Sequence, residues 1–162
     1  MFDSVRRGYS ALEKSSPEEI AAYFEAVDSG AVRGHINNIK GILFEQEYVE
    51  ALEAAGTHAA MFEATNHPVT DIMVFGGLND VSEIQLKATD SVSYVTSAVN
   101  EHPEILFAVT SEVATKIGDA VVVNTGIENS ALEQAIEEAL FAEAVNPFSA
   151  LSALRFLIGI PF

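Results

Sequence analysis

The stretch that decides the fold runs from Thr70 to Ala88 and reads TDIMVFGGLNDVSEIQLKA. Two β-prone segments, Thr70–Phe75 and Glu83–Ala88, predict strands, and the turn residues 76–80 between them favour a hairpin. Successive side chains of a strand point to opposite faces, so the pair predicts one apolar and one polar face. The apolar face takes Ile72, Val74, Ile84 and Leu86, and the other takes Asp71, Met73, Phe75, Glu83, Gln85 and Lys87.

Upstream of this hairpin the pattern is helical. Ser16-Pro17-Glu18-Glu19 combines a cap, a first-turn proline and a capping box, so a helix begins there and ends near Ser29-Gly30. A longer helix is predicted from about Gly34 to Ala55, followed by a strand at Ala59–Ala64. Residues 1–15 hold no strong pattern.

Downstream, helices and short strands alternate. Asp90 is the expected cap of a helix over residues 91–100, and Ser130 with Glu133 the expected cap of a last helix that ends near Val145. The order α-α-βββ-α-β-α-β-α predicts an α/β fold with a mixed sheet. Its remaining elements are strands at Ile105–Thr110 and Val121–Val123 and a short helix at Ser111–Ile117.

The order of these elements carries a family resemblance. The helix contains Gly41-Ile42-Leu43-Phe44-Glu45, the first hairpin strand contains Asp71, and the second contains Gln85-Leu86-Lys87. In this arrangement the chain resembles the PD-(D/E)XK nuclease superfamily, as a variant with Gln-x-Lys. The resemblance implies a restriction-endonuclease-like fold, in which a mixed central sheet is flanked by helices. We expect a single domain, with a helical extension at 1–33, a core at 34–146 and an apolar tail or helix at 147–162.

The resemblance also implies metal-assisted hydrolysis of phosphodiester bonds in DNA or, less favoured, RNA. Asp71 would hold Mg²⁺ or Mn²⁺, Gln85 with a backbone carbonyl would complete the inner ligands, and Lys87 would orient water or stabilise the phosphate. Glu45 would bind a second metal or a metal-bound water, with Glu47 as its competitor. Since an amide oxygen binds Mg²⁺ more weakly than a carboxylate, Glu83 on the same face is a further candidate ligand.

Plainer roles compete with this interpretation. Lys87 could pair with Asp71 or Glu83 across the strands, a surface ion pair of little energetic weight. Ser93, Tyr94 and Ser97 fall on the helix after Lys87, where nuclease folds can face the scissile phosphate, but capping and surface roles are favoured for them. The four histidines show no ligand spacing.

Composition limits the function. Of 162 residues, 49% are hydrophobic, which allows one folded domain, and the net charge of −16 comes without any basic run. Such a surface repels nucleic acid, so a nuclease module in a larger protein or beside a basic partner is expected. The alternative is a catalytically inactive nuclease-fold domain that serves as an interaction or assembly module. No cysteine is present, which fits the reducing cytoplasm.

The last residues, 147–162, are apolar but too short to span a bilayer. We expect a helix or tail packed on the core. A partner-binding or homodimer-forming tail and the start of a membrane segment are the alternatives.

Overall fold

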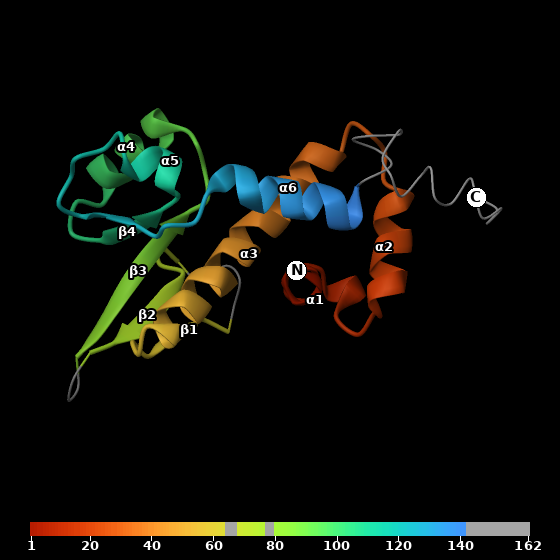
Figure 1. The fold of residues 1–162 in the computed structure, drawn as a ribbon, viewed down its shortest axis with the longest axis horizontal. Coiled ribbons are helices and arrows are strands. Elements are labelled where there is room, and N and C mark those ends of the chain that lie inside the picture. The colour runs from red at the N-terminus through yellow and green to blue at the C-terminus, as the bar shows by residue number, and fades with distance from the viewer. Residues whose placement is uncertain (64–67, 77–79, 142–162) are drawn as a thin grey trace. The chain divides into compact units, whose positions relative to one another are not determined.

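The computed structural model describes residues 1–63, 68–76 and 80–141. Six α-helices, one 3-10 turn and five strands are assigned within these residues (Figure 1). In chain order they are α1 (Phe2–Gly8), η1 (Ser10–Leu12), α2 (Pro17–Glu25), α3 (Val32–Ala54), β1 (Ala59–Met61), β2 (Ile72–Phe75), β3 (Val81–Lys87), α4 (Val92–Glu101), β4 (Leu106–Val109), α5 (Ser111–Ala114), β5 (Val122–Asn124) and α6 (Asn129–Leu140).

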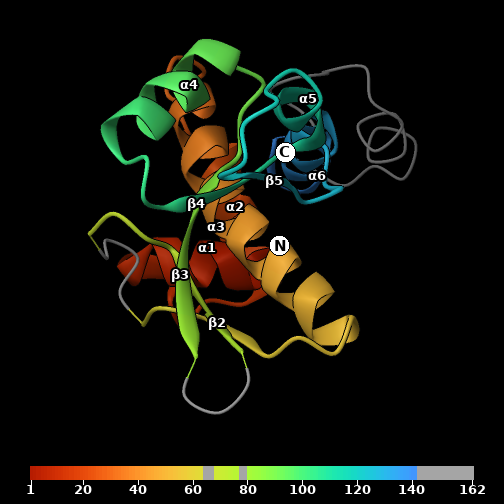
Figure 2. The same ribbon diagram turned by 90° about the vertical axis from the view of Figure 1, so that its left-hand side faces the viewer.

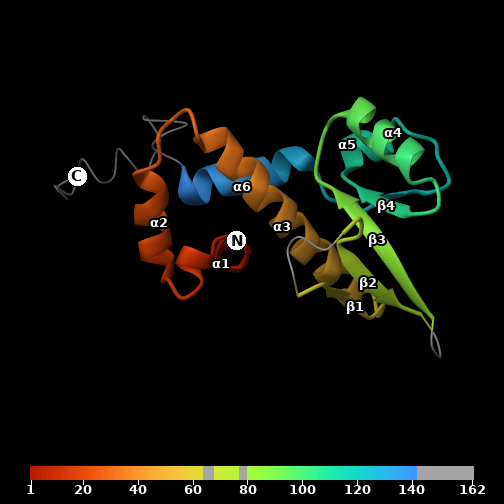
Figure 3. The same cartoon turned by 180° about the vertical axis from the view of Figure 1, so that it is seen from behind.

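The chain divides into two compact units. One comprises Met1–Ile39 and the chain from Glu133 onward, and the other comprises Lys40–Leu132. The first unit is helical and contains α1 and α2, which are labelled in Figure 3. Its interior holds Phe24, whose ring meets that of Phe141 edge-on at 5.2 Å between centroids.

The start of the chain corrects one expectation. No helix was predicted before residue 16, yet α1 covers Phe2–Gly8 and buries Val5 completely. The helix is too short to show a periodic pattern in the sequence. The capping box at Ser16 is confirmed, because its side chain accepts from the N–H of Glu19 while the Glu19 side chain accepts from the N–H of Ser16.

The second unit is built on a five-stranded sheet in the order β1-β2-β3-β4-β5. The first three strands are antiparallel, whereas β3, β4 and β5 run parallel. Figure 2 shows β3 extending from the β2 side of the sheet towards β4. The predicted mixed α/β architecture, with a central sheet flanked by helices, is therefore confirmed.

The register of the hairpin sorts its side chains. Ile72 lies opposite Ile84, and both are buried together with Leu86, so the predicted apolar face is confirmed. Val74 on this face is half-buried. The strand β3 begins at Val81, earlier than predicted, because Val81 still pairs with Phe75.

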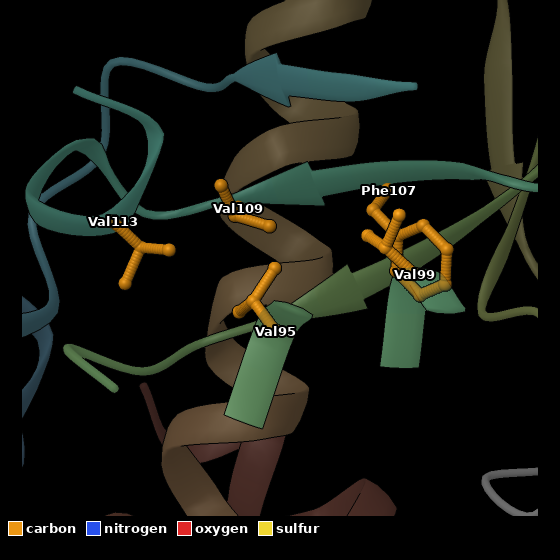
Figure 4. Close-up of a cluster of buried hydrophobic side chains, with 5 residues drawn as sticks. All are labelled: Val95, Val99, Phe107, Val109 and Val113. Carbon is orange, nitrogen blue, oxygen red and sulfur yellow. The ribbon is translucent and has the colours of Figure 1, made fainter. Parts of the chain in front are cut away.

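The opposite face of the sheet is covered at β4. Phe107 and Val109 from β4 form a buried cluster with Val95 and Val99 of α4 and with Val113 of α5. Figure 4 shows α4 in front of the strands while α3 passes behind them. Residues paired in a parallel ladder point to the same side of the sheet. Gln85 and Lys87, which pair with Phe107 and Val109, therefore also lie on the α4 face.

Two predicted caps are wrong. The N-cap of α4 is Ser91, whose side chain accepts from the N–H of Tyr94, and not Asp90. The helix α6 begins at Asn129, and its first N–H groups are satisfied by Glu112 of α5 rather than by the predicted pair of Ser130 and Glu133. A carboxylate brought by tertiary folding therefore replaces the local capping box.

The predicted helix end near Val145 and the apolar segment 147–162 lie outside the described residues. Within the part of the chain that the structure describes, no helix is long and apolar enough to cross a membrane.

Candidate functional site

Asp71 immediately precedes β2 and is fastened to β3 at two points. Its N–H donates to the carbonyl of Ile84 at 2.9 Å, and its carboxylate Oδ2 accepts from the N–H of Leu86 at 2.6 Å. The carboxylate thus takes the place of a main-chain acceptor where the β2–β3 ladder ends. Continuing the register by one step places Asp71 opposite Gln85, on the polar face that the sequence predicted.

Gln85 stands in the middle of β3 and pairs with Phe107 of β4. Its residue is half-buried, but its amide Oε1 is fully buried and accepts no hydrogen bond within the described part of the chain. Leaving such an acceptor unsatisfied costs roughly 1–3 kcal/mol. A buried amide oxygen on a strand next to the segment that carries Asp71 is a ligand that suits a hard cation such as Mg²⁺.

Lys87 is the last residue of β3 and pairs with Val109, so it shares the α4 face with Gln85. Its Nζ lies 5.5 Å from the centroid of the Tyr94 ring, in the first turn of α4. Among the ion pairs of the described residues, none joins Lys87 to Asp71 or Glu83. The cross-strand ion pair considered from the sequence is therefore not formed, and a cation–π contact takes its place.

The two remaining carboxylates are placed differently. Glu83 is exposed, lies opposite Met73, and accepts a hydrogen bond from the Thr70 hydroxyl at 2.8 Å. Glu45 is half-buried on α3, whereas its competitor Glu47 is exposed. The structure thus brings Asp71, Gln85 and Lys87 together on one face, with Glu83 further along the same strand.

The side chains on this face provide few ligands for a metal ion. Among the described residues, no three His, Asp or Glu side chains lie close enough together to hold a metal ion. A cation on this face would therefore need the Gln85 amide and a main-chain carbonyl beside the Asp71 carboxylate. The Oε1 of Gln85, which is buried and accepts no hydrogen bond from the described residues, fits that requirement.

A strained turn leads into Asp71. Val69 has φ of 71°, and the N–H of Thr70 donates to the carbonyl of Pro68 at 2.9 Å, which closes a three-residue γ-turn around Val69. A β-branched residue in this left-handed region is uncommon and costs of order 1–3 kcal/mol. The turn directs the chain so that Asp71 meets β3.

The unit that carries this face has a strongly negative net charge. Between Lys40 and Leu132 the sequence holds three lysines and fourteen acidic residues, a balance of −11. Lys40 is buried, so Lys87 and Lys116 are the unburied cations of this unit.

For Tyr94, the sequence favoured a capping or surface role over a position that faces the scissile phosphate. Tyr94 lies over Lys87 and is 54% exposed. The signal for this contact was its place in the first turn of the helix that directly follows β3.

No protein-family model, curated protein or solved structure matches this chain. The function is therefore inferred from the residues of the site itself.

Proposed function

We propose that this chain is a Mg²⁺- or Mn²⁺-dependent phosphodiesterase of the PD-(D/E)XK nuclease type, with Asp71, Gln85 and Lys87 as its central residues. The observation that carries the proposal is the sheet register, which aligns Asp71 with Gln85 and sets Lys87 two residues further on the same face. The order α3, three antiparallel strands, α4 and parallel β4 also agrees with what the resemblance implied.

Each residue has a chemical role in this proposal. The carboxylate of Asp71 and the amide oxygen of Gln85 would hold the metal ion. Glu45, expected from the resemblance to bind a second ion or its water, has no role in this proposal, because α3 passes behind the sheet whereas Gln85 and Lys87 share the α4 face. A divalent ion, when bound, supplies a Lewis acid and lowers the pKa of water. Lys87 would place its ammonium beside the phosphate, where it offsets negative charge that develops during hydrolysis.

Gln85 stands where the PD-(D/E)XK pattern has a carboxylate, and this difference would change the affinity of the site for metal. A neutral amide oxygen leaves the metal site with one negative charge fewer, so metal affinity is lowered. Glu83 is a poorer substitute, because the Thr70 hydroxyl already donates to its carboxylate. Activity is therefore expected to need millimolar rather than micromolar metal.

The test is hydrolysis of labelled DNA and RNA in Mg²⁺ or Mn²⁺ with matched lysine variants. Lys87→Ala should lower the rate about 100-fold or more, as expected for loss of a charge-stabilising group. Lys116→Ala, which removes the other unburied lysine of the same unit, should leave the rate unchanged. Equal rates for wild type and Lys87→Ala, with both folded, would refute the assignment.

One observation favours a second function, a catalytically inactive nuclease-fold domain that acts as an interaction module. The Asp71 carboxylate already serves the backbone of β3, so this residue has a structural reason to be present without any metal. This alternative predicts no hydrolysis and no Mg²⁺-dependent rise in melting temperature. A metal-dependent rise that Gln85→Leu abolishes would argue against it.

A further inference from the structure

The contact between Lys87 and Tyr94 joins a cation to an aromatic surface on one face of the sheet. Lys87 is half-buried, whereas Tyr94 keeps 54% of its surface exposed although Lys87 lies over its ring. Tyr94 is the most exposed of the large apolar and aromatic side chains in the described residues. An exposed ring beside a lysine can offer a nucleobase a stacking surface and its phosphate a positive charge.

The charge of this unit restricts what could be stacked there. Duplex binding depends on many phosphate contacts, each made by a lysine, an arginine or an N–H donor. Against fourteen acidic residues this unit offers Lys87 and Lys116 as unburied cations. A short single strand places few phosphates near these acids and gains most of its affinity from stacking.

We infer that the substrate is a short single-stranded oligonucleotide, positioned by stacking of one base on Tyr94 while Lys87 meets an adjoining phosphate. This inference rests on the proposed function, since it names the substrate class of the same site. Tyr94 is then the residue that selects single strands over duplexes. Its hydroxyl has no part in the selection, because stacking needs only the ring.

The experiment measures binding of a labelled short oligothymidylate, and of a duplex containing the same strand, in Ca²⁺ so that hydrolysis does not intervene. Wild type should bind the single strand more tightly than the duplex. Tyr94→Leu should weaken single-strand binding about ten-fold or more, in line with the loss of one stacked base. Tyr94→Phe should bind like wild type, and so should Tyr23→Leu, which changes another exposed tyrosine.

A second readout does not depend on how well the leucine variant folds. Stacking should quench tyrosine emission when the oligothymidylate binds to wild type, and this quenching should be smaller in Tyr94→Phe although binding persists. Equal binding by Tyr94→Leu, equal quenching in Tyr94→Phe, or tighter binding of duplex would each overturn the inference.

The same set separates the inference from the proposed function. Tyr94-dependent binding without hydrolysis in Mg²⁺ would uphold single-strand binding by stacking on Tyr94 and refute the catalytic proposal, so that the oligonucleotide would be a ligand and not a substrate. Hydrolysis with the same KM in wild type and Tyr94→Leu would uphold catalysis and refute the inference. Absence of oligonucleotide binding would refute both.

Discussion

The carboxylate of Asp71 accepts a hydrogen bond from the backbone N–H of Leu86 at 2.6 Å, where the pairing of β2 with β3 ends. This bond gives Asp71 two separable functions, one in closing the sheet and one as a proposed metal ligand. Leu86 is buried, so its N–H has little access to water if the acceptor is removed.

We therefore expect two substitutions of Asp71 to differ in their effect on stability and to agree in their effect on Mg²⁺ binding. Asp71→Asn keeps an acceptor for Leu86 and should change the free energy of unfolding little. Asp71→Ala leaves the N–H unsatisfied and should lose about 1–3 kcal/mol. Denaturant unfolding measures the difference, and a metal titration should show weakened Mg²⁺ binding in both. Equal unfolding free energies for the two variants would show that the hydrogen bond is unimportant.

Substitutions of Gln85 should change the stability of the fold in opposite directions with and without metal. In chelator, Gln85→Leu should stabilise the fold by about 1 kcal/mol, because it removes a buried oxygen that lacks a donor among the described residues. Gln85→Glu should destabilise it in chelator, because a second carboxylate then stands opposite Asp71. In Mg²⁺ the order of stability of the two variants should reverse. Of wild type and the two variants, Gln85→Glu should show the largest rise in melting temperature when Mg²⁺ replaces chelator.

The control for this comparison is Glu83→Gln. Glu83 lies on the same strand and face but is exposed and bonded to Thr70. Its substitution should leave the Mg²⁺-dependent rise in melting temperature close to that of wild type. A rise that disappears in Glu83→Gln but persists in Gln85→Leu would move the metal site along the strand.

Several local features of the fold could be predicted from the sequence, whereas features made by distant residues could not. The capping box at Ser16 and the two faces of the hairpin depend on residues a few positions apart. The cap of α6 depends on Glu112, which lies 17 residues from Asn129 and 18 from Ser130 in the chain, so no local pattern marks it.

The candidate site divides in the same way. The alternation of β3 was enough to align Gln85 with Lys87, and the turn was enough to bring Asp71 across from them. The sequence could not show that Asp71 would bond to Leu86 or that Lys87 would meet Tyr94 instead of a carboxylate, because both depend on side-chain conformations. The positive φ of Val69 was equally hidden, since a valine is an unfavourable choice for that backbone region.

Val69 yields a prediction about strain. Val69→Gly should raise the free energy of unfolding by about 1 kcal/mol, because relief of the left-handed conformation exceeds the entropy cost of a glycine. Val69→Ala keeps a Cβ in that conformation and should raise the free energy of unfolding much less. If the strained turn also fixes Asp71, the glycine variant should bind Mg²⁺ more weakly although it is more stable. A destabilised Val69→Gly would show that the valine side chain contributes packing that outweighs strain.

The capping of α6 by Glu112 predicts a dependence on pH. Partial burial raises the pKa of Glu112, but hydrogen bonds from the N–H groups of Asn129 and Ser130 outweigh burial, so the pKa lies below its ordinary value of 4.5. A carboxyl with a lower pKa in the folded state stabilises the fold above its unfolded pKa, and this contribution is lost as the pH falls through the folded pKa. Stability should therefore decline below about pH 4.5 in part through Glu112.

Glu112→Gln should isolate that contribution. At neutral pH we expect a loss of about 1 kcal/mol in the free energy of unfolding, typical of a weakened helix cap. The loss should shrink as the pH is lowered, because wild-type Glu112 then becomes neutral as well. Glu101→Gln, at an exposed position at the end of α4, is the control and should give a constant difference. A difference between wild type and Glu112→Gln that stays the same from neutral to acidic pH would show that the charge of Glu112 does not hold the start of α6.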